Sequence, residues 1–344
     1  MPRGNVRHVK AASNGSWPAV SVVLPVLNEE RHLQASVAAI LEQSYPGEIE
    51  VVLALGPSSD RTDQVAERLA NDPRVSIVAN PTGRTPNGLN AAIAASRHPV
   101  IARVDGHAVI PPDYLRTAVA LLDRTGADNV GGLMSAHGVT DIEQAVARAM
   151  TSKLGVGNAP FHVGGHEGPA DTVYLGVFRR TAIERVGGYD ESFRRAQDWE
   201  MNFRLRATGG LVWFSPELSV SYRPRGSLRA VAKQYFHYGR WRRQVMRTHP
   251  SSISLRYLAP PVAVAGVAAG TVTGLVGLGL GKPSLVAGFV LPGGYLALVA
   301  GGSLATSRGL APKARALLPA VLVTMHMSWG SGFLSSWRLG RRRG

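Results

Sequence analysis

The sequence contains no cysteine, and this absence excludes a disulfide framework and a cysteine-ligated zinc site. A cysteine-free chain suits a reducing compartment. Residues 1–17 are polar and lack the apolar core of a secretory signal peptide. We therefore expect the folded part of the chain to stay in the cytoplasm.

Acidic residues are missing from the last third of the chain. All 23 aspartates and glutamates lie at or before Glu217, whereas 17 of the 38 lysines and arginines follow it. The net charge of +15 therefore comes from the C-terminal region, where basic residues flank long apolar stretches. This arrangement favours contact with anionic or pyrophosphate-bearing membrane lipids and argues against nucleic acid as a partner.

Charged residues are absent from three apolar stretches, residues 257–280, 284–307 and 316–337. Each is long enough for a membrane helix, which needs about 20 residues. We expect the first two to span a membrane. The third contains His326, and three spans would place the basic tail 338–344 outside, against the positive-inside tendency. Two spans with a re-entrant or interfacial third stretch therefore remain an alternative to three, and buried globular helices remain an alternative for all three.

Apolar runs alternate with helical patterns in the N-terminal half. The predicted strands are 19–27, 48–55, 75–79 and 100–104, and the predicted helices are 30–43, 60–71, 87–96 and 111–125. This alternation at short spacing predicts an α/β fold with a mostly parallel, doubly wound sheet. A further strand is predicted at 171–178.

The apolar run 100–104 ends abruptly in Asp105-Gly106-His107. Open α/β sheets place their ligands at the carboxyl ends of the strands. Side chains two apart on a continued strand share one face, and a turn at Gly106 could also bring both onto one cation. Asp105 and His107 are therefore candidate metal ligands; the alternative is an aspartate that caps a turn beside an exposed histidine.

Asp198 lies at the predicted start of a helix, within Gln197-Asp198-Trp199-Glu200. Backbone amides at a helix start favour the carboxylate form, which would keep Asp198 available as a general base. The alternative is a simple N-cap. Trp199 either packs in the core or offers a flat face to a sugar ring.

Two further segments carry candidate residues. The glycine-rich tract 155–168 is expected to be a mobile loop; its His162 and His166 could ligate a metal, but no third ligand accompanies them. Residues 228–247 form a basic, aromatic, amphipathic helical pattern. We expect that helix to lie on a membrane surface, and RNA binding is the alternative.

Several motifs, taken in order, resemble the family 2 inverting glycosyltransferases of the GT-A fold, and among them bacterial membrane-bound enzymes of the succinoglycan glucosyltransferase type. The matching segments are 21–29, Ser58-Ser59-Asp60-Arg61-Thr62, Asn87-Gly88-Leu89-Asn90, 103–108, Gln197-Asp198-Trp199-Glu200, 223–227 and 234–240. The resemblance implies a GT-A domain at 19–225 after a polar tail, 1–18. An interface helix at 226–250, a membrane region at 257–337 and the basic tail at 338–344 would follow.

The resemblance also implies roles for particular residues. Donor binding is assigned to Pro25, Asn28, Glu29, Asp60, Asn90, Arg103 and Asp105. Asp105 and His107 would hold Mn²⁺ or Mg²⁺, and the imidazole favours Mn²⁺. Asp198 would be the general base. Acceptor binding is assigned to Trp199, Glu200, Arg240 and Trp241.

The implied activity is transfer of a sugar from a nucleoside-diphosphate sugar, expected to be a UDP-hexose, to a polyprenyl-linked or cell-envelope glycan. The expected location is the plasma membrane, multi-pass, with the catalytic domain in the cytoplasm. Residues 52–56 lack the acid with which the family usually reads the nucleotide base. The Gln-x-x-Arg-Trp motif of processive synthases is also absent, so we expect non-processive transfer.

Two other functions remain open at this point. A catalytically inactive GT-A scaffold in an envelope assembly complex would explain the missing base-reading acid and His107 in place of an aspartate. A membrane-tethered nucleotidyltransferase would share the sheet and the metal site. It would need a basic, glycine-rich loop after the first strand, where this chain has Asn28-Glu29-Glu30.

Overall fold

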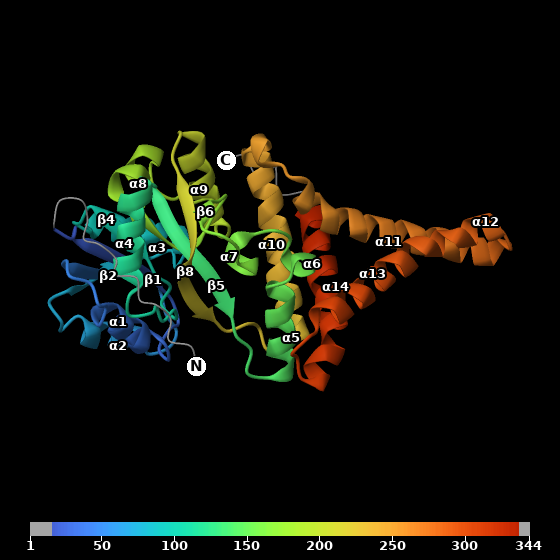
Figure 1. Cartoon of the computed structure of the whole chain (residues 1–344), viewed down its shortest axis with the longest axis horizontal. Helices are drawn as coiled ribbons and strands as arrows, with labels where there is room; N and C mark the ends of the chain where they lie inside the picture. The colour runs from blue at the N-terminus through green and yellow to red at the C-terminus, as the bar shows by residue number, and fades with distance from the viewer. Residues whose placement is uncertain (1–15, 337–344) are drawn as a thin grey trace. The chain divides into compact units, whose positions relative to one another are not determined.

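A computed structural model describes residues 16–336 (Figure 1). The chain divides into two compact units. The first comprises residues 1–135 and 164–222, and the second comprises residues 136–163 and 223–344. Most of the predicted polar tail 1–18, Trp337 of the third apolar stretch and the whole basic tail 338–344 lie outside the described residues.

One eight-stranded mixed sheet forms the centre of the first unit, with the order β3-β2-β1-β4-β7-β5-β8-β6. The strands are β1 (Val20–Val26), β2 (Ile49–Leu55), β3 (Val75–Ala79), β4 (Val100–Arg103), β5 (Asn129–Ala136), β6 (Gly168–Pro169), β7 (Tyr174–Arg179) and β8 (Val212–Tyr222). β1 pairs in parallel with β2 and β4, and β2 with β3. β7 pairs antiparallel with β4 and β5, and β6 pairs antiparallel with β8.

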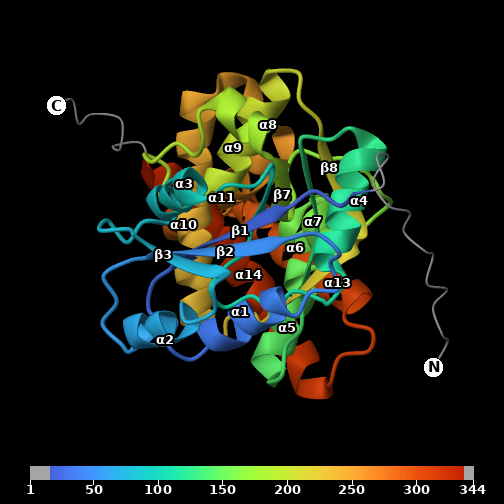
Figure 2. The same cartoon turned by 90° about the vertical axis from the view of Figure 1, so that its left-hand side faces the viewer.

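Helices cover both faces of the parallel half, as its mostly apolar central strands β1 and β2 require. α1 and α2 lie together on one side of β1, β2 and β3, and α3 lies on the other (Figure 2). The helices of this unit are α1 (Leu33–Leu41), α2 (Thr62–Leu69), α3 (Thr85–Ala95), α4 (Tyr114–Thr125), α8 (Arg180–Val186) and α9 (Gln197–Ala207). The alternating elements predicted up to residue 125 are confirmed, with ends displaced by a few residues.

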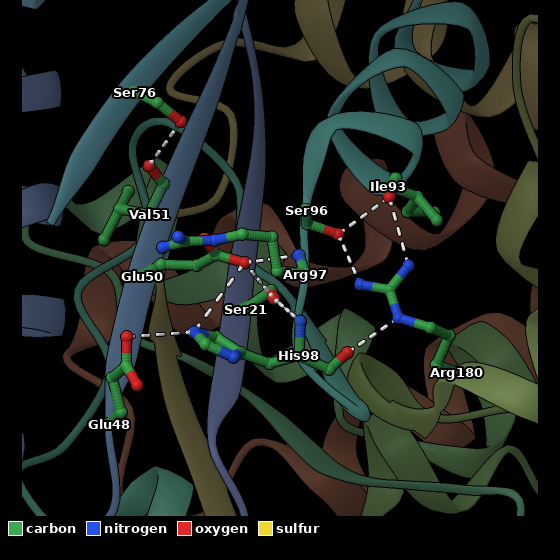
Figure 3. A network of polar contacts seen from close by, with 10 residues as sticks. All are labelled: Ser21, Glu48, Glu50, Val51, Ser76, Ile93, Ser96, Arg97, His98 and Arg180. Atoms are coloured by element: carbon green, nitrogen blue, oxygen red, sulfur yellow. Dashed lines mark hydrogen bonds and ion pairs between the residues drawn. The ribbon is translucent and has the colours of Figure 1, made fainter.

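A polar network closes the amino ends of the central strands, at the edge opposite to the site described below (Figure 3). Buried Glu50 of β2 accepts hydrogen bonds from the Ser21 hydroxyl at 2.5 Å and the Arg97 amide at 2.6 Å. Burial raises the pKa of Glu50, but these hydrogen bonds outweigh it and the pKa is lowered. Arg180 joins the network through the His98 carbonyl at 2.7 Å. These contacts fix the strands to one another at their buried starts.

The tract 155–168 differs from the expected irregular loop. It includes the second half of one short helix, α6 (Lys153–Val156), all of a second, α7 (Pro160–Val163), and the first residue of β6. Ser152 caps α6, since its hydroxyl accepts a hydrogen bond from the Gly155 amide at 3.1 Å. His162 lies in α7, where burial lowers its pKa to about 4. Among the described residues no group of three metal-capable side chains includes it.

Long helices make up most of the second unit. They are α5 (Asp141–Met150), α10 (Leu228–Thr248), α11 (Leu255–Leu280), α12 (Pro283–Val286), α13 (Val290–Thr306) and α14 (Pro312–Ser335), with 3₁₀ turns at Pro250–Ser252 and Ala287–Phe289. α10 and α14 cross closely. A Cβ added at Gly239 would lie 1.9 Å from the Trp329 carbonyl oxygen, and one at Gly332 would lie 2.0 Å from that of Phe236. The helix predicted at 228–247 is thus confirmed.

Three helical segments of this unit could cross a membrane by length and composition, namely Leu255–Leu280, Pro283–Thr306 and Pro312–Ser335. They match the three predicted apolar stretches. α14 runs unbroken from Pro312 to Ser335, so no re-entrant turn interrupts the third segment.

Candidate functional site

A cavity of about 350 Å³ opens at the carboxyl ends of β1 and β4 in the first unit. The loop after β1 contributes Leu27 and Glu29 to its wall, and the loop after β4 contributes Asp105, Gly106 and His107. Because β1 and β4 are parallel neighbours, their following loops meet at one edge of the sheet. The cavity therefore lies where the sequence predicts the site.

Arg103, the last residue of β4, joins two parts of the chain far apart in sequence. Its side chain is 9% exposed, and it donates through Nη2 to Asp105 Oδ1 at 2.6 Å and through Nη1 to Asp198 Oδ2 at 2.8 Å. The two aspartates predicted to serve one site thus bind one guanidinium. Arg103 lines the cavity together with Asp105, whereas Asp198 is not among the lining residues and reaches the site through its ion pair with Arg103.

The environment of Asp198 differs from the sequence expectation. The residue lies in the first turn of α9, as predicted. Burial nevertheless raises its pKa, and the nearby Arg103 guanidinium offsets this only in part. The backbone amides at the start of α9 therefore do not determine the direction in which the pKa of Asp198 shifts. Asp198 Oδ1 is buried without a hydrogen-bond partner among the described residues, which leaves one carboxylate oxygen able to accept a proton.

His107 is fixed by Glu29. The imidazole Nδ1 lies 2.8 Å from Glu29 Oε1, and this hydrogen bond raises the pKa of His107 against the effect of partial burial. No group of three or more metal-capable side chains occurs among residues 16–336. Asp105 and His107 nevertheless suit a hard divalent cation, because Mg²⁺ and Mn²⁺ sites often use one or two protein ligands and take the rest from phosphate and water.

Three predicted donor residues do not line the cavity but hold its loops. The Asn28 carboxamide accepts a hydrogen bond from the Ser59 amide at 2.8 Å. Both Asp60 oxygens are occupied, by Thr62 and by the Glu30 amide at 3.3 Å. Asn90 donates to the Tyr189 carbonyl at 2.8 Å. Pro25 and Glu29 do line the cavity, as do Arg103 and Asp105.

The predicted acceptor residues have other surroundings. Trp199 is 7% exposed and stacks on Phe203, with ring centroids 5.6 Å apart. Glu200 is 1% exposed and forms an ion pair with Arg204 at 2.7 Å. Both side chains belong to the packing of α9. The other two predicted acceptor residues, at positions 240 and 241, lie on α10 in the second unit.

The structure adds residues that the sequence analysis did not select. Buried Tyr189 lies beside Asp198, where its hydroxyl offsets only a small part of the rise that burial causes in the pKa of Asp198. Asn80, directly after β3, and Gln197 line the cavity. The position of Asn80 at the carboxyl end of a parallel strand is a signal that could have found it. Tyr189 follows Gly187 and Gly188, both at positive φ, which mark a tight turn.

Comparison with known proteins identifies the family of this chain. The family model described as "Glycosyl transferase family 2" matches residues 21–187. The succinoglycan biosynthesis protein ExoA of Rhizobium meliloti (strain 1021) is 32% identical over 320 residues, which cover 92% of this chain and 93% of the relative. The chain belongs to glycosyl transferase family 2. The resemblance on which the expected residue roles depend is therefore confirmed.

This family 2 glycosyltransferase also has the expected GT-A fold. It is similar to the mannosyltransferase PcManGT from Pyrobaculum calidifontis, solved in complex with GDP-Man and Mn²⁺. The TM-score is 0.58 at 20% identity, over 96% of this chain and 90% of the other. A second relative, from Methanococcus voltae, is 24% identical over 230 residues, which cover 64% of this chain and 71% of the relative. Its name is dolichyl N-acetyl-alpha-D-glucosaminyl phosphate 3-beta-D-2,3-diacetamido-2,3-dideoxy-beta-D-glucuronosyltransferase.

Proposed function

We propose that this glycosyltransferase moves a hexose from a nucleoside-diphosphate sugar to a lipid-linked or envelope glycan acceptor, with inversion and with a divalent cation. The observation that carries the proposal is the pair of ion pairs from Arg103 to Asp105 and to Asp198. They bring the predicted cation ligand and the predicted base to one guanidinium beside one cavity.

The residues of the site divide the work of a single displacement. Asp105 and His107 would hold Mn²⁺ or Mg²⁺, which when bound offsets the charge that grows on the departing diphosphate. Arg103 fixes the orientation of Asp105 and compensates its charge. Asp198 accepts the proton of the acceptor hydroxyl as its oxygen bonds to the anomeric carbon, while the bond from that carbon to the diphosphate oxygen breaks.

The raised pKa of Asp198 suits this role. A carboxylate with a higher pKa is a stronger base, and the neighbouring Arg103 guanidinium favours its ionised form. Arg103 covers one oxygen of Asp198, so the acceptor hydroxyl would approach the oxygen that has no partner among the described residues, Oδ1.

The acceptor and the location are proposed from the second unit and the relatives. The three apolar helices would anchor the chain in the plasma membrane. Arg308, Lys313 and Arg315, beside the turn between α13 and α14, would face the cytoplasm with the catalytic unit. The ExoA name points to polysaccharide assembly, and the Methanococcus voltae name to a lipid-linked acceptor. Non-processive addition is proposed because the processive motif is absent.

Transfer by the full chain in membranes tests the proposal. Membranes that contain the protein would be incubated with labelled UDP- and GDP-sugars, with Mn²⁺, Mg²⁺ or EDTA. We expect cation-dependent transfer that Asp105→Asn and Asp198→Asn each reduce by a factor of about 100 or more. Asp63→Asn is the matched control, because Asp63 is an exposed residue of α2 outside the cavity.

Either of two results would overturn the assignment. Unchanged sugar transfer by the Asp198→Asn variant would show that Asp198 is not the general base. Donor binding with no transfer by the wild type, with any of the sugars or cations, would favour the inactive scaffold instead.

A further inference from the structure

A second cavity, of about 590 Å³, lies wholly within the second unit. Its wall is built from the end of β5 and the following turn, from α5 and α6, and from the end of α13 with the turn that follows it. It is separate from the cavity at Arg103, with which it shares no lining residue.

The wall of this cavity is basic. His137, Arg148, Lys153 and Arg308 line it, and no aspartate or glutamate does. Glu143 is next to the lining residue Gln144 in sequence. Its carboxylate forms an ion pair with Arg223 at 2.9 Å and accepts a hydrogen bond from the Thr140 amide at 3.0 Å. Lys153 and Arg308 form no ion pair with any residue from 16 to 336. Lys153 and Arg308 therefore present positive charge to the cavity that no carboxylate of the described chain pairs with.

Helix contacts hold these groups in place. Arg148 of α5 donates through Nη1 to the carbonyl of Thr306, the last residue of α13, at 2.8 Å. His326 of α14 is hydrogen-bonded through Nε2 to the Leu154 carbonyl at 2.8 Å, next to Lys153. Leu154 also packs on Gly302 of α13, where an added Cβ would lie 2.2 Å from its side chain. The basic groups thus belong to a framework fixed to α13 and α14.

The position of the cavity relative to the candidate membrane spans indicates the depth in a bilayer at which a ligand would bind. Thr306 and Arg308 lie at the end of one candidate span, and the next begins at Pro312. Lipid phosphates lie at that level of a bilayer, just outside the hydrocarbon core. Leu154 and Leu310 add apolar surface to the same wall, which suits the first carbons of a lipid.

We propose that this cavity binds the phosphate of a membrane lipid head group. Arg148, Lys153 and Arg308 supply the donors and the charge, and the leucines contact the adjoining carbons. The phosphate can belong to a bulk anionic phospholipid or to a prenyl diphosphate. The proposal rests on the placement of α13 and α14 in the membrane and not on sugar transfer, so a binding measurement tests it separately.

Calorimetric titration of the purified full chain in detergent tests this site with soluble probes. The probes are dihexanoyl phosphatidic acid, geranyl diphosphate, dihexanoyl phosphatidylcholine and inorganic pyrophosphate. We expect phosphatidic acid, geranyl diphosphate or both to bind more tightly than phosphatidylcholine and pyrophosphate. The one that binds more tightly identifies the source of the phosphate.

A matched pair of double variants locates the binding. Lys153→Gln with Arg308→Gln should weaken the tighter probe by about tenfold or more. Arg229→Gln with Lys233→Gln removes the same charge from exposed positions of α10 outside the cavity and should change it less than about threefold. None of these four substitutions changes Arg148, whose contact with Thr306 holds α5 to α13, so the variants should fold. Thermal unfolding without probe checks this.

Three results would overturn the proposal. An equal loss of probe affinity in both double variants would show that the probe is attracted nonspecifically by the net positive charge of the protein. Pyrophosphate binding as tight as that of both lipid probes would show an anion site without lipid recognition. No binding of either lipid phosphate by the folded wild type would leave no site of this kind.

Discussion

Arg103 determines the charge balance of the catalytic cavity. Its one positive charge faces the two negative charges of Asp105 and Asp198 when both are ionised. Arg103 therefore compensates only one of these two negative charges. A bound cation would compensate the other, and this is consistent with the raised pKa of Asp198, to which the nearby Asp105 charge contributes.

Replacing Arg103 should affect both stability and transfer. In Arg103→Lys, a single ammonium cannot hold two carboxylates at the present separation. We expect a loss of about 3 kcal/mol of unfolding free energy, because a largely buried charge loses its partner. Transfer should fall by about 100-fold. Thermal unfolding and initial rates with a labelled donor measure the two effects.

Arg61→Lys is the control for this substitution. Arg61 also binds a carboxylate, that of Glu30 at 2.5 Å, but its side chain is 74% exposed. An exposed pair contributes about 0–1 kcal/mol, so both readouts should stay near wild type. Equal effects of Arg61→Lys and Arg103→Lys would contradict the central role of Arg103.

The site could be predicted only in part from the sequence. Asp105 and His107 follow an apolar run, and that pattern alone indicates the carboxyl end of a buried strand. Arg103 was selected as a donor residue, but its bond to Asp198 joins segments 95 residues apart, and no local pattern encodes it. The burial of Glu200 was not predicted for a similar reason, because α9 packs polar and aromatic residues inward without clear amphipathic spacing; for Trp199 it was one of two alternatives.

At the level of elements, the crossing of α10 and α14 depends on two glycines. Gly239→Ala or Gly332→Ala would place a methyl group within 2.0 Å of a carbonyl oxygen on the facing helix. The helices would have to separate, which we expect to cost about 1–3 kcal/mol. Gly266→Ala and Gly301→Ala are the controls, because nothing lies within 4 Å of the added atom in α11 or α13. Unfolding of the purified chain in detergent should separate the two pairs.

The start of α5 should make stability depend on acid pH. Hydrogen bonds from the Thr140 backbone and from Arg223 lower the pKa of Glu143 to about 2 from an ordinary 4.5. Because the folded-state pKa is the lower one, the ionised group stabilises the fold above about pH 4.5. This contribution is lost as the pH falls towards 2.

Glu143→Gln should therefore melt at a lower temperature than wild type at neutral pH, and the difference should shrink to nothing near pH 2. Melting curves from pH 2 to 7 measure it. Glu67→Gln should show no such trend, because Glu67 is an exposed residue of α2 whose side chain makes no hydrogen bond within residues 16–336. A difference for Glu143→Gln that stays constant with pH would mean that packing rather than charge stabilises this position.

The parallel half of the sheet was predictable because its strands are apolar, glycine-poor runs between clear turn signals. β5 and β8 were not predicted, and their sequences show why. β5 contains Gly131 and Gly132, which let the neighbouring chain approach so closely that a Cβ at Gly132 would lie 1.6 Å from the Leu218 carbonyl oxygen. β8 contains Pro216, a residue that locally indicates a turn. Tertiary packing decides both strands.

At the scale of the whole molecule, the cysteine-free sequence allows membrane topology to be measured with single added thiols. If the catalytic unit is cytoplasmic and all three helices cross, Ser284→Cys should react with an impermeant maleimide from outside the cell. Ala311→Cys should react only from the cytoplasmic side. The unaltered chain is the control, since it has no thiol to label.

Labelling of both positions from the same side would exclude a crossing by the Pro283–Thr306 segment. Reaction of Ala311→Cys from outside would invert the proposed orientation. Only the first result would also remove the membrane level that the lipid-phosphate site requires, because both faces of a bilayer carry phosphates.

The chain passes from one unit to the other three times, after residues 135, 163 and 222. The segment 136–163 belongs to the second unit and contains α5. Its residues Val146, Ala149 and Met150 are buried in that unit, where α5 packs against α14. A ribosome releases this segment well before it makes α14. Until the last helix emerges, the apolar face of α5 therefore lacks the α14 surface that completes its packing.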